Sequence, residues 1–154
     1  MQDTIKKLIG TYEFEIRDVA GKVKDRWSVQ NLVTNAGFAQ LALLAGDASA
    51  VPFTYMALGT SSTAPAVTDT TLTAEIVDTG LERAAGTVSR VTTTVTNDTY
   101  RITKTWTATG SKTIEEVGVF NAASSGTMLS HALTTSKTVA NGETITGTYS
   151  LKFA

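Results

Sequence analysis

The stretch that decides the fold is Val91-Thr-Thr-Thr-Val-Thr-Asn-Asp-Thr-Tyr-Arg-Ile-Thr-Lys-Thr-Trp106. It is typical of two β-strands that fold back on each other at Asn97-Asp98, because both residues tolerate the positive φ of a two-residue turn. That turn would pair Val91 with Lys104. Strand side chains alternate between faces, so this register predicts one Thr-rich face and one apolar face made of Val91, Val95, Tyr100, Ile102 and Trp106. The stretch predicts an antiparallel β-protein and carries no catalytic pattern.

Composition narrows the class of protein. The chain has 154 residues, of which 42% are hydrophobic and 18% charged, with no cysteine and a net charge of −1. Charged residues usually make up about 25%, and threonine takes their place here. A charge near zero gives no support for binding nucleic acid or an anionic membrane. The lack of cysteine excludes disulfides and Cys-ligated metals. No signal peptide is expected in residues 1–10, and the run 41–45 is too short to span a bilayer.

The N-terminal third predicts an arm, a hairpin and a helix. Residues 1–10 are assigned to an N-terminal arm, and the remainder, 11–154, to one β-sandwich domain. Residues 11–29 alternate like two strands joined at a turn that contains Gly21, where a positive φ is expected. A helix is expected at about residues 35–45, capped by Thr34 or Asn35 and followed by Gly46. Phe38, Leu41, Ala42 and Ala45 recur at helical spacing, with Leu44 flanking them, so the helix is expected to cover one side or end of a sheet.

The rest of the chain predicts further strands. Residues 53–58 form a short apolar run, and 81–96 a long strand with a bulge near Ser89-Arg90. Asp69 could cap a short helix over 70–76. Asn141-Gly142 is a strong hairpin signal. About eight strands separated by turn signals, with one convincing helix, predict an antiparallel β-sandwich or barrel.

Side chains that could carry chemistry are few. His131 shares its strand face with Leu129 and Leu133, so a core or interface position is expected, and no second His or Cys completes a zinc site. Glu115 and Glu116 should point to opposite faces of a strand. The loop Gly59–Asp69 lacks the Gly-Lys-Ser/Thr ending of a phosphate loop. Trp27 and Trp106 fit a core or interface better than a sugar platform. The sequence therefore predicts no catalytic, cofactor-binding or metal-ligating residue, and no enzyme.

Four segments in order resemble a family of small virion structural proteins of tailed bacteriophages. The segments are Asn31–Gly37; Phe53–Thr60 with Thr63–Leu72; Arg90–Tyr100; and Thr113–Ala122 with Gly126–Leu129, and the closing strand from Asn141 to Phe153 fits as well. The resemblance covers the chain from about Tyr12 onward. It implies a capsid decoration protein or a tail-fibre, collar or baseplate component, and it brings no catalytic residues.

Three functions follow as hypotheses. The first is a capsid decoration (cement) protein that binds the major capsid protein on the outside of an assembled head as a trimer and stabilises the shell. The alternative is a tail-fibre, neck/collar or baseplate adaptor that binds tail or neck proteins. The alternative of another class is a receptor or glycan-binding module. The expected location is the outer surface of the virion, after synthesis in the host cytoplasm.

Overall fold

The computed structural model describes residues 8–153, which form ten strands and one helix. Of the predicted arm, residues 1–10, positions 1–7 lie outside the described residues. Positions 8–10 begin the first strand. The elements are β1 (Leu8–Arg17), β2 (Val23–Gln30), β3 (Leu32–Val33), α1 (Asn35–Gly46), β4 (Tyr55–Gly59), β5 (Ala84–Ala85), β6 (Thr87–Val91), β7 (Thr99–Thr107), β8 (Lys112–Phe120), β9 (Met128–Val139) and β10 (Thr144–Phe153).

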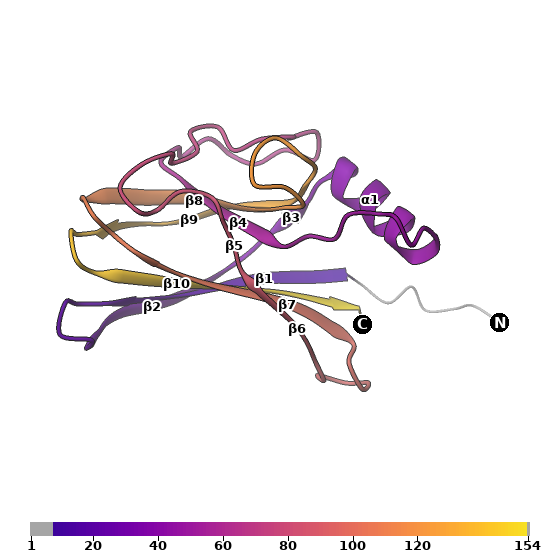
Figure 1. Cartoon of the computed structure of the whole chain (residues 1–154), viewed down its shortest axis with the longest axis horizontal. Coiled ribbons are helices and arrows are strands. Elements are labelled where there is room, and N and C mark those ends of the chain that lie inside the picture. The colour runs from indigo at the N-terminus through magenta and orange to yellow at the C-terminus, as the bar shows by residue number, and fades with distance from the viewer. Residues whose placement is uncertain (1–7, 154) are drawn as a thin grey trace.

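Two antiparallel five-stranded sheets pack face to face, as Figure 1 shows. The first sheet has the order β2-β1-β10-β7-β6, and the second has the order β3-β9-β8-β4-β5. Their facing sides supply the main core, which includes Tyr12, Phe14, Ile102, Trp106 and Tyr149. This confirms the predicted β-sandwich with one helix, and the sheets do not close into a barrel.

The first hairpin forms as predicted. Tyr12, Phe14 and Ile16 of β1 are buried because they alternate with the polar residues that face outward. The turn to β2 contains Gly21 at φ +83°, as its position predicted.

The register predicted for residues 91–106 is wrong. Val91 pairs with Thr99 rather than Lys104, and residues 92–98 form a wide loop instead of a two-residue turn. The carboxylate of Asp98 holds this loop by accepting hydrogen bonds from the backbone N–H groups of Thr93, Thr94 and Val95. These side-chain hydrogen bonds stabilise the wide loop, so the chain forms it instead of the two-residue hairpin turn. The faces predicted for the second strand, now β7, are correct. Ile102 and Trp106 are buried, and Lys104 lies on the same side of the strand, opposite Gly147 of β10.

The long strand predicted over 81–96 is also wrong, because the chain changes sheets at Gly86. β5 belongs to the second sheet and β6 to the first. A Cβ at Gly86 would lie 2.6 Å from Ile102 Cγ1 and 2.9 Å from Thr103 O, so only glycine passes here.

Asn141-Gly142 makes a turn, with Gly142 at φ +84°, but the turn does not close a hairpin. It joins β9 of the second sheet to β10 of the first. Gly142 N–H donates to Ala108 O, which lies in the neighbouring crossing from β7 to β8. The sequence signal therefore located the turn correctly and its partner strands wrongly.

Helix α1 begins at its predicted cap. Thr34 Oγ1 accepts from Gly37 N at 2.9 Å and donates to Met128 O at 2.6 Å. Gly37 is the buried residue of the helix, and a Cβ there would lie 2.9 Å from Leu129 Cα. The predicted apolar side is only partly correct: Leu41 and the flanking Leu44 pack on the core, while Phe38, Ala42 and Ala45 are exposed. The close contact at Gly37 sets the rotation of the helix, so that Leu41 and Leu44 on the same side face the sandwich and Phe38 faces out.

Candidate functional site

The outer face of the second sheet is covered by the segment 60–83, which contains no regular helix or strand. Leu72 from this segment packs with Ala57, Phe120 and Met128 to form a small second core. Gly118 permits this contact, because a Cβ there would lie 3.0 Å from Leu72 Cδ2. The helix predicted over 70–76 does not form. A loop of this length in a compact protein is normally held in place by specific contacts, and the charged residues beneath it supply them.

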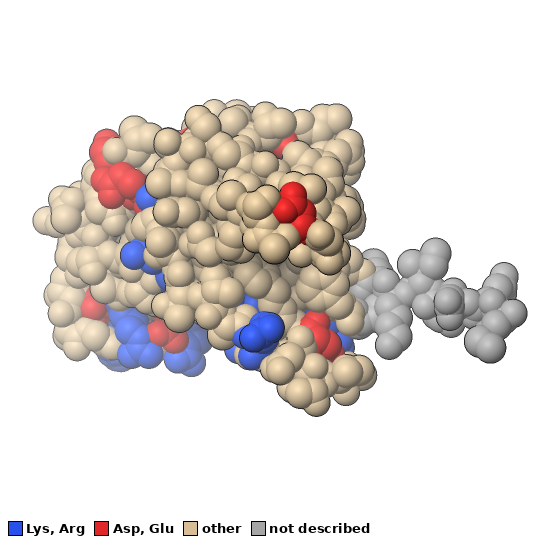
Figure 2. All heavy atoms as spheres, turned by 45° about the vertical axis from the view of Figure 1, so that its right-hand side comes forward, with Lys and Arg blue, Asp and Glu red and all other residues tan. Residues whose placement is uncertain are grey.

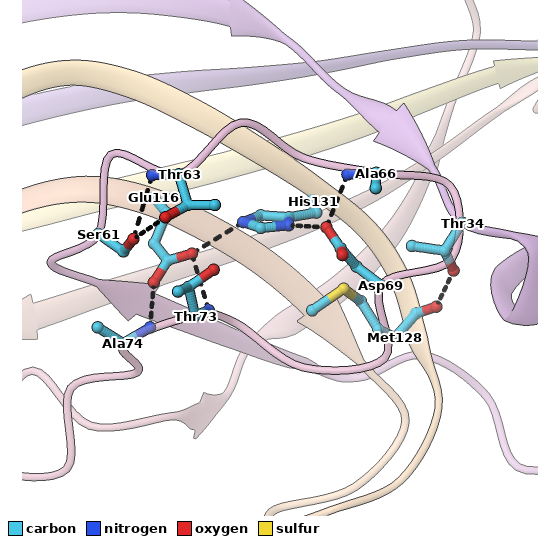
Figure 3. Close-up of polar contacts among 10 residues, drawn as sticks. All are labelled: Thr34, Ser61, Thr63, Ala66, Asp69, Thr73, Ala74, Glu116, Met128 and His131. Carbon is cyan, nitrogen blue, oxygen red and sulfur yellow. Dashed lines mark hydrogen bonds and ion pairs between the residues drawn. The ribbon is translucent and has the colours of Figure 1, made fainter.

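A buried histidine flanked by two carboxylates fastens the loop, as Figure 3 shows. His131 Nδ1 lies 2.8 Å from Asp69 Oδ2, and His131 Nε2 lies 2.8 Å from Glu116 Oε2. Glu116 also accepts from Thr73 N at 3.1 Å and from Ala74 N at 2.7 Å. Asp69 accepts from Ala66 N at 2.8 Å, so its carboxylate bonds back into its own loop. The network therefore ties β8 and β9 to both ends of the 66–74 stretch.

The sheet places these groups side by side. His131 pairs with Gly118 across β8 and β9, and the register shifts between Ile114 and Glu116. This bulge lets Ile114 and Val117 enter the main core while Glu116 turns outward beneath the loop. His131 is 1% exposed and Glu116 0%, and both are satisfied by hydrogen bonds.

The charges in the network stabilise one another. Burial alone would lower the pKa of His131, but the hydrogen bonds to Glu116 and Asp69 outweigh it and raise that pKa above the ordinary value. Burial likewise opposes the ionisation of Glu116, yet the bonds from His131, Ala74 and Thr73 lower its pKa. The pKa of Asp69 is lowered first by the Ala66 N–H and then by His131. An imidazolium between two carboxylates is the state that this geometry favours.

This arrangement does not suit acid–base chemistry. A general base needs a nitrogen free to reach a substrate, whereas both nitrogens of His131 are bound to carboxylates beneath the loop. The nearby hydroxyls of Ser61 and Thr63 bond to each other at 3.0 Å. Within residues 8–153, no group of three or more His, Asp or Glu side chains is arranged to hold a metal ion.

A second anchor lies further along the same segment. Arg83 makes two hydrogen bonds to the carboxylate of Glu75, at 2.8 and 2.6 Å, and donates to Ala122 O and Ser125 O. Its guanidinium carbon lies 3.6 Å from the centre of the Phe120 ring. Bidentate geometry and an aromatic face make this a strong contact, so the segment is fixed at both its middle and its end.

The two tryptophans are already used by the fold. Trp106 is buried and its indole N–H donates to Glu82 O at 2.8 Å. Trp27 is half-buried, stacks on Phe14 with ring centres 5.1 Å apart, and donates to Thr134 Oγ1. The prediction was a core or interface position for both residues; Trp106 lies in the core, and Trp27 packs partly buried against it.

The outer face of the first sheet is rich in hydroxyls. Thr105 and Thr146 bond across β7 and β10 at 2.8 Å, and Thr103 and Thr148 at 3.3 Å. This is the Thr-rich face that the alternation of β7 predicted. It is bordered by Glu15, which bonds to Arg26 at 2.7 Å.

Sequence reasoning placed His131 in the interior but missed its partners. Asp69 lies 62 positions from His131 and Glu116 lies 15, with no motif that links them. The one usable signal was chemical: a buried histidine and a buried carboxylate each require a partner.

The described residues thus form a two-sheet sandwich in which buried charged groups hold the 60–83 segment in place. Residues 33–150, about three quarters of the chain, match the model of the family described as podophage GP4 fiber I protein gp80. The chain belongs to this family, and it is accordingly a phage virion structural protein of fibre type. No curated protein and no solved structure matches it. In the part of the chain that the structure describes, no helix could cross a membrane.

Proposed function

We propose that the protein is a non-enzymatic component of a phage tail fibre, and that it works by binding other virion proteins. The family match over residues 33–150 carries this proposal. It supports the tail-fibre alternative better than the capsid-decoration hypothesis, which nothing in the fold specifically favours.

The geometry supports a structural role over a catalytic one. The long segment 60–83 is clamped to the second sheet by the His131 network and by Arg83, which leaves a rigid surface instead of a mobile lid. A rigid, near-neutral, hydroxyl-rich sandwich can be packed beside other proteins without long-range repulsion.

Microscopy of intact virions tests the location. Antibody fragments raised against the purified protein should label the tail region and leave the head unlabelled. Uniform label over the head would favour capsid decoration and overturn the tail-fibre assignment. A glycan array with the purified protein tests the remaining alternative, and specific binding there would point to a receptor-binding module.

A further inference from the structure

A groove opens at the end of the sandwich where α1 stands, which is the right-hand end in Figure 1. It is about 500 Å³ in volume, and side chains of α1 and of both sheets line it. The lining ranges from Leu129 and Leu151, which are 0% exposed, to Val88 and Phe153, which are 43% and 51% exposed. The groove therefore leads from the surface toward the main core. Sites for small molecules are typically about 300–1,000 Å³ in volume, and this groove lies within that range.

The lining of the groove offers a ligand few hydrogen-bonding partners. Most of it is hydrocarbon, including Leu41 of α1 and Phe53 ahead of β4. The hydroxyl of Tyr100 already donates to Phe53 O at 2.7 Å, and Ser89 belongs to the outer face of the sheet, where it pairs with Arg101. A sugar, a nucleotide or a peptide in this groove would bury polar groups without partners. The groove therefore suits a ligand that is mainly hydrocarbon.

Arg90 is the only charged residue among the described residues that line the groove. Within residues 8–153, Arg17, Arg26 and Arg83 form ion pairs, whereas Arg90 forms none. When this end of the molecule is turned forward in Figure 2, most of the visible surface is uncharged, and the Lys and Arg lie mainly in its lower part. An uncharged occupant would cover the guanidinium of Arg90 and leave it without a partner, which costs free energy. The occupant that the groove favours therefore carries an anionic group.

We propose that the groove binds a fatty acid, with the hydrocarbon chain among the apolar side chains and the carboxylate on the guanidinium of Arg90. A guanidinium presents its N–H donors in a planar fork that matches the two oxygens of a carboxylate. The rest of a fatty acid has no polar group, so none is left unpaired in the groove.

Isothermal titration calorimetry with laurate, below the concentration at which it forms micelles, tests the need for a charge. Laurate should bind the wild-type protein at one site per chain, and methyl laurate, which has no charge, should bind more weakly. Arg90→Gln should weaken laurate binding about fivefold or more and leave methyl laurate binding unchanged. Arg101→Gln, on the neighbouring strand but on the outer face, is the matched control and should bind both probes like the wild type.

Filling the groove tests where the hydrocarbon chain lies. Val88→Trp should block laurate and methyl laurate alike, because the larger side chain takes up space in the groove. Val95→Trp is the matched control, since Val95 is 57% exposed in the 92–98 loop and is not among the residues that line the groove. Circular dichroism checks that each variant is folded. If Val88→Trp does not fold, the comparison of the two probes with Arg90→Gln still decides the proposal.

Two further measurements separate a fatty acid from other occupants. Sedimentation with phosphatidylglycerol vesicles should leave the protein in the supernatant, and co-sedimentation that Val88→Trp abolishes would assign the groove to membrane lipid. Light scattering coupled to gel filtration should give wild type and Val88→Trp the same mass, and a lower mass for the variant would assign the groove to a second copy. Either result overturns the proposal, as does an absence of laurate binding, equal affinity for the two probes, or equal losses in Arg90→Gln and Arg101→Gln. None of these outcomes depends on where the protein lies in the virion.

Discussion

At the scale of single residues, His131 is a buried side chain that forms ion pairs with a carboxylate on each side. Its imidazole, buried to 1% exposure, is held between Asp69 and Glu116 at 2.8 Å on each side. A buried ion pair is no guarantee of stability, because desolvation offsets the attraction. Breaking it is different, since the group left behind is buried without a partner.

Glu116→Gln should therefore destabilise the fold by about 2–4 kcal/mol. The amide keeps the shape of the side chain but removes the charge that faces His131 and the N–H groups of Thr73 and Ala74. Urea unfolding followed by tryptophan fluorescence measures the change. Glu115→Gln, next to it and only half-buried, is the control and should stay within about 0.5 kcal/mol of wild type. Equal losses in both variants would contradict the role given to Glu116.

The network should also make stability depend on pH. The folded pKa of His131 is raised, so its contribution is fully present below the unfolded value of about 6.5 and is lost as pH rises through the folded value. The pKa values of Glu116 and Asp69 are lowered, so their contribution is present above about pH 4.5 and is lost as pH falls through the folded values. The network is therefore strongest between these limits.

Replacing the histidine isolates this effect. The difference in unfolding free energy between wild type and His131→Gln should be largest near pH 6 and shrink as pH rises through the raised pKa of His131. Urea titrations at a series of pH values measure it. A difference that grows with rising pH would mean that His131 is neutral in the folded protein.

At the scale of elements, α1 shows how one small residue sets the orientation of a whole helix. Gly37 lies so close to β9 that a Cβ would meet Leu129 Cα at 2.9 Å. This contact fixes which side of α1 faces the sheet, and it explains why Leu41 and Leu44 face inward while Phe38 does not.

Two Gly→Ala changes in α1 distinguish the effect of close packing against β9 from the effect of helix propensity. Gly37→Ala should destabilise by about 1–3 kcal/mol, because the added methyl group must displace the backbone of β9. Gly46→Ala meets nothing within 4 Å and should be neutral or stabilise by up to about 1 kcal/mol, since alanine is the better helix former. Thermal unfolding by circular dichroism compares the two. Similar shifts for both would mean that α1 is not packed closely on β9.

The sequence predicted elements better than their connections. β1, β2, α1 and β7 were predicted close to their observed places because alternation, helical spacing and the Thr34 cap are local signals. The errors arose where a distant or unusual contact decides the outcome. Asp98 caps a wide loop, which the Asn-Asp pair alone does not predict. The chain passes between the sheets at Gly86, because Ile102 and Thr103 leave no room for a larger residue. The site was missed for the same reason, since only the folded chain brings Asp69, Glu116 and His131 together.

At the scale of the whole molecule, the two outer faces differ in kind. The first sheet presents hydroxyls directly, with Thr105 bonded to Thr146. The second sheet is hidden beneath residues 60–83, which the His131 network and the Glu75–Arg83 pair hold down. The covering segment should therefore be the first part to open when its anchor is weakened.

Limited digestion with a non-specific protease checks this order. Glu116→Gln should be cut first within residues 60–76, as read by mass spectrometry of the fragments. Ile145→Val, which loosens the main core through a fully buried side chain, serves as a control with no effect on the anchor. First cuts at the same place in both variants would show that the segment opens independently of the network.

The free borders of the two sheets have a consequence for how the protein behaves at high concentration. Among the described strands, β2, β6, β3 and β5 are edge strands, each paired on one side only. Exposed edge strands can pair with strands of other molecules and so promote aggregation. β2 carries Lys24, Asp25 and Arg26 in succession, which discourages an incoming strand, and β3 and β5 are only two residues long. β6 is short and contains Arg90. The sandwich is thus protected against edge-to-edge aggregation, so a high local concentration of the protein need not produce fibrils.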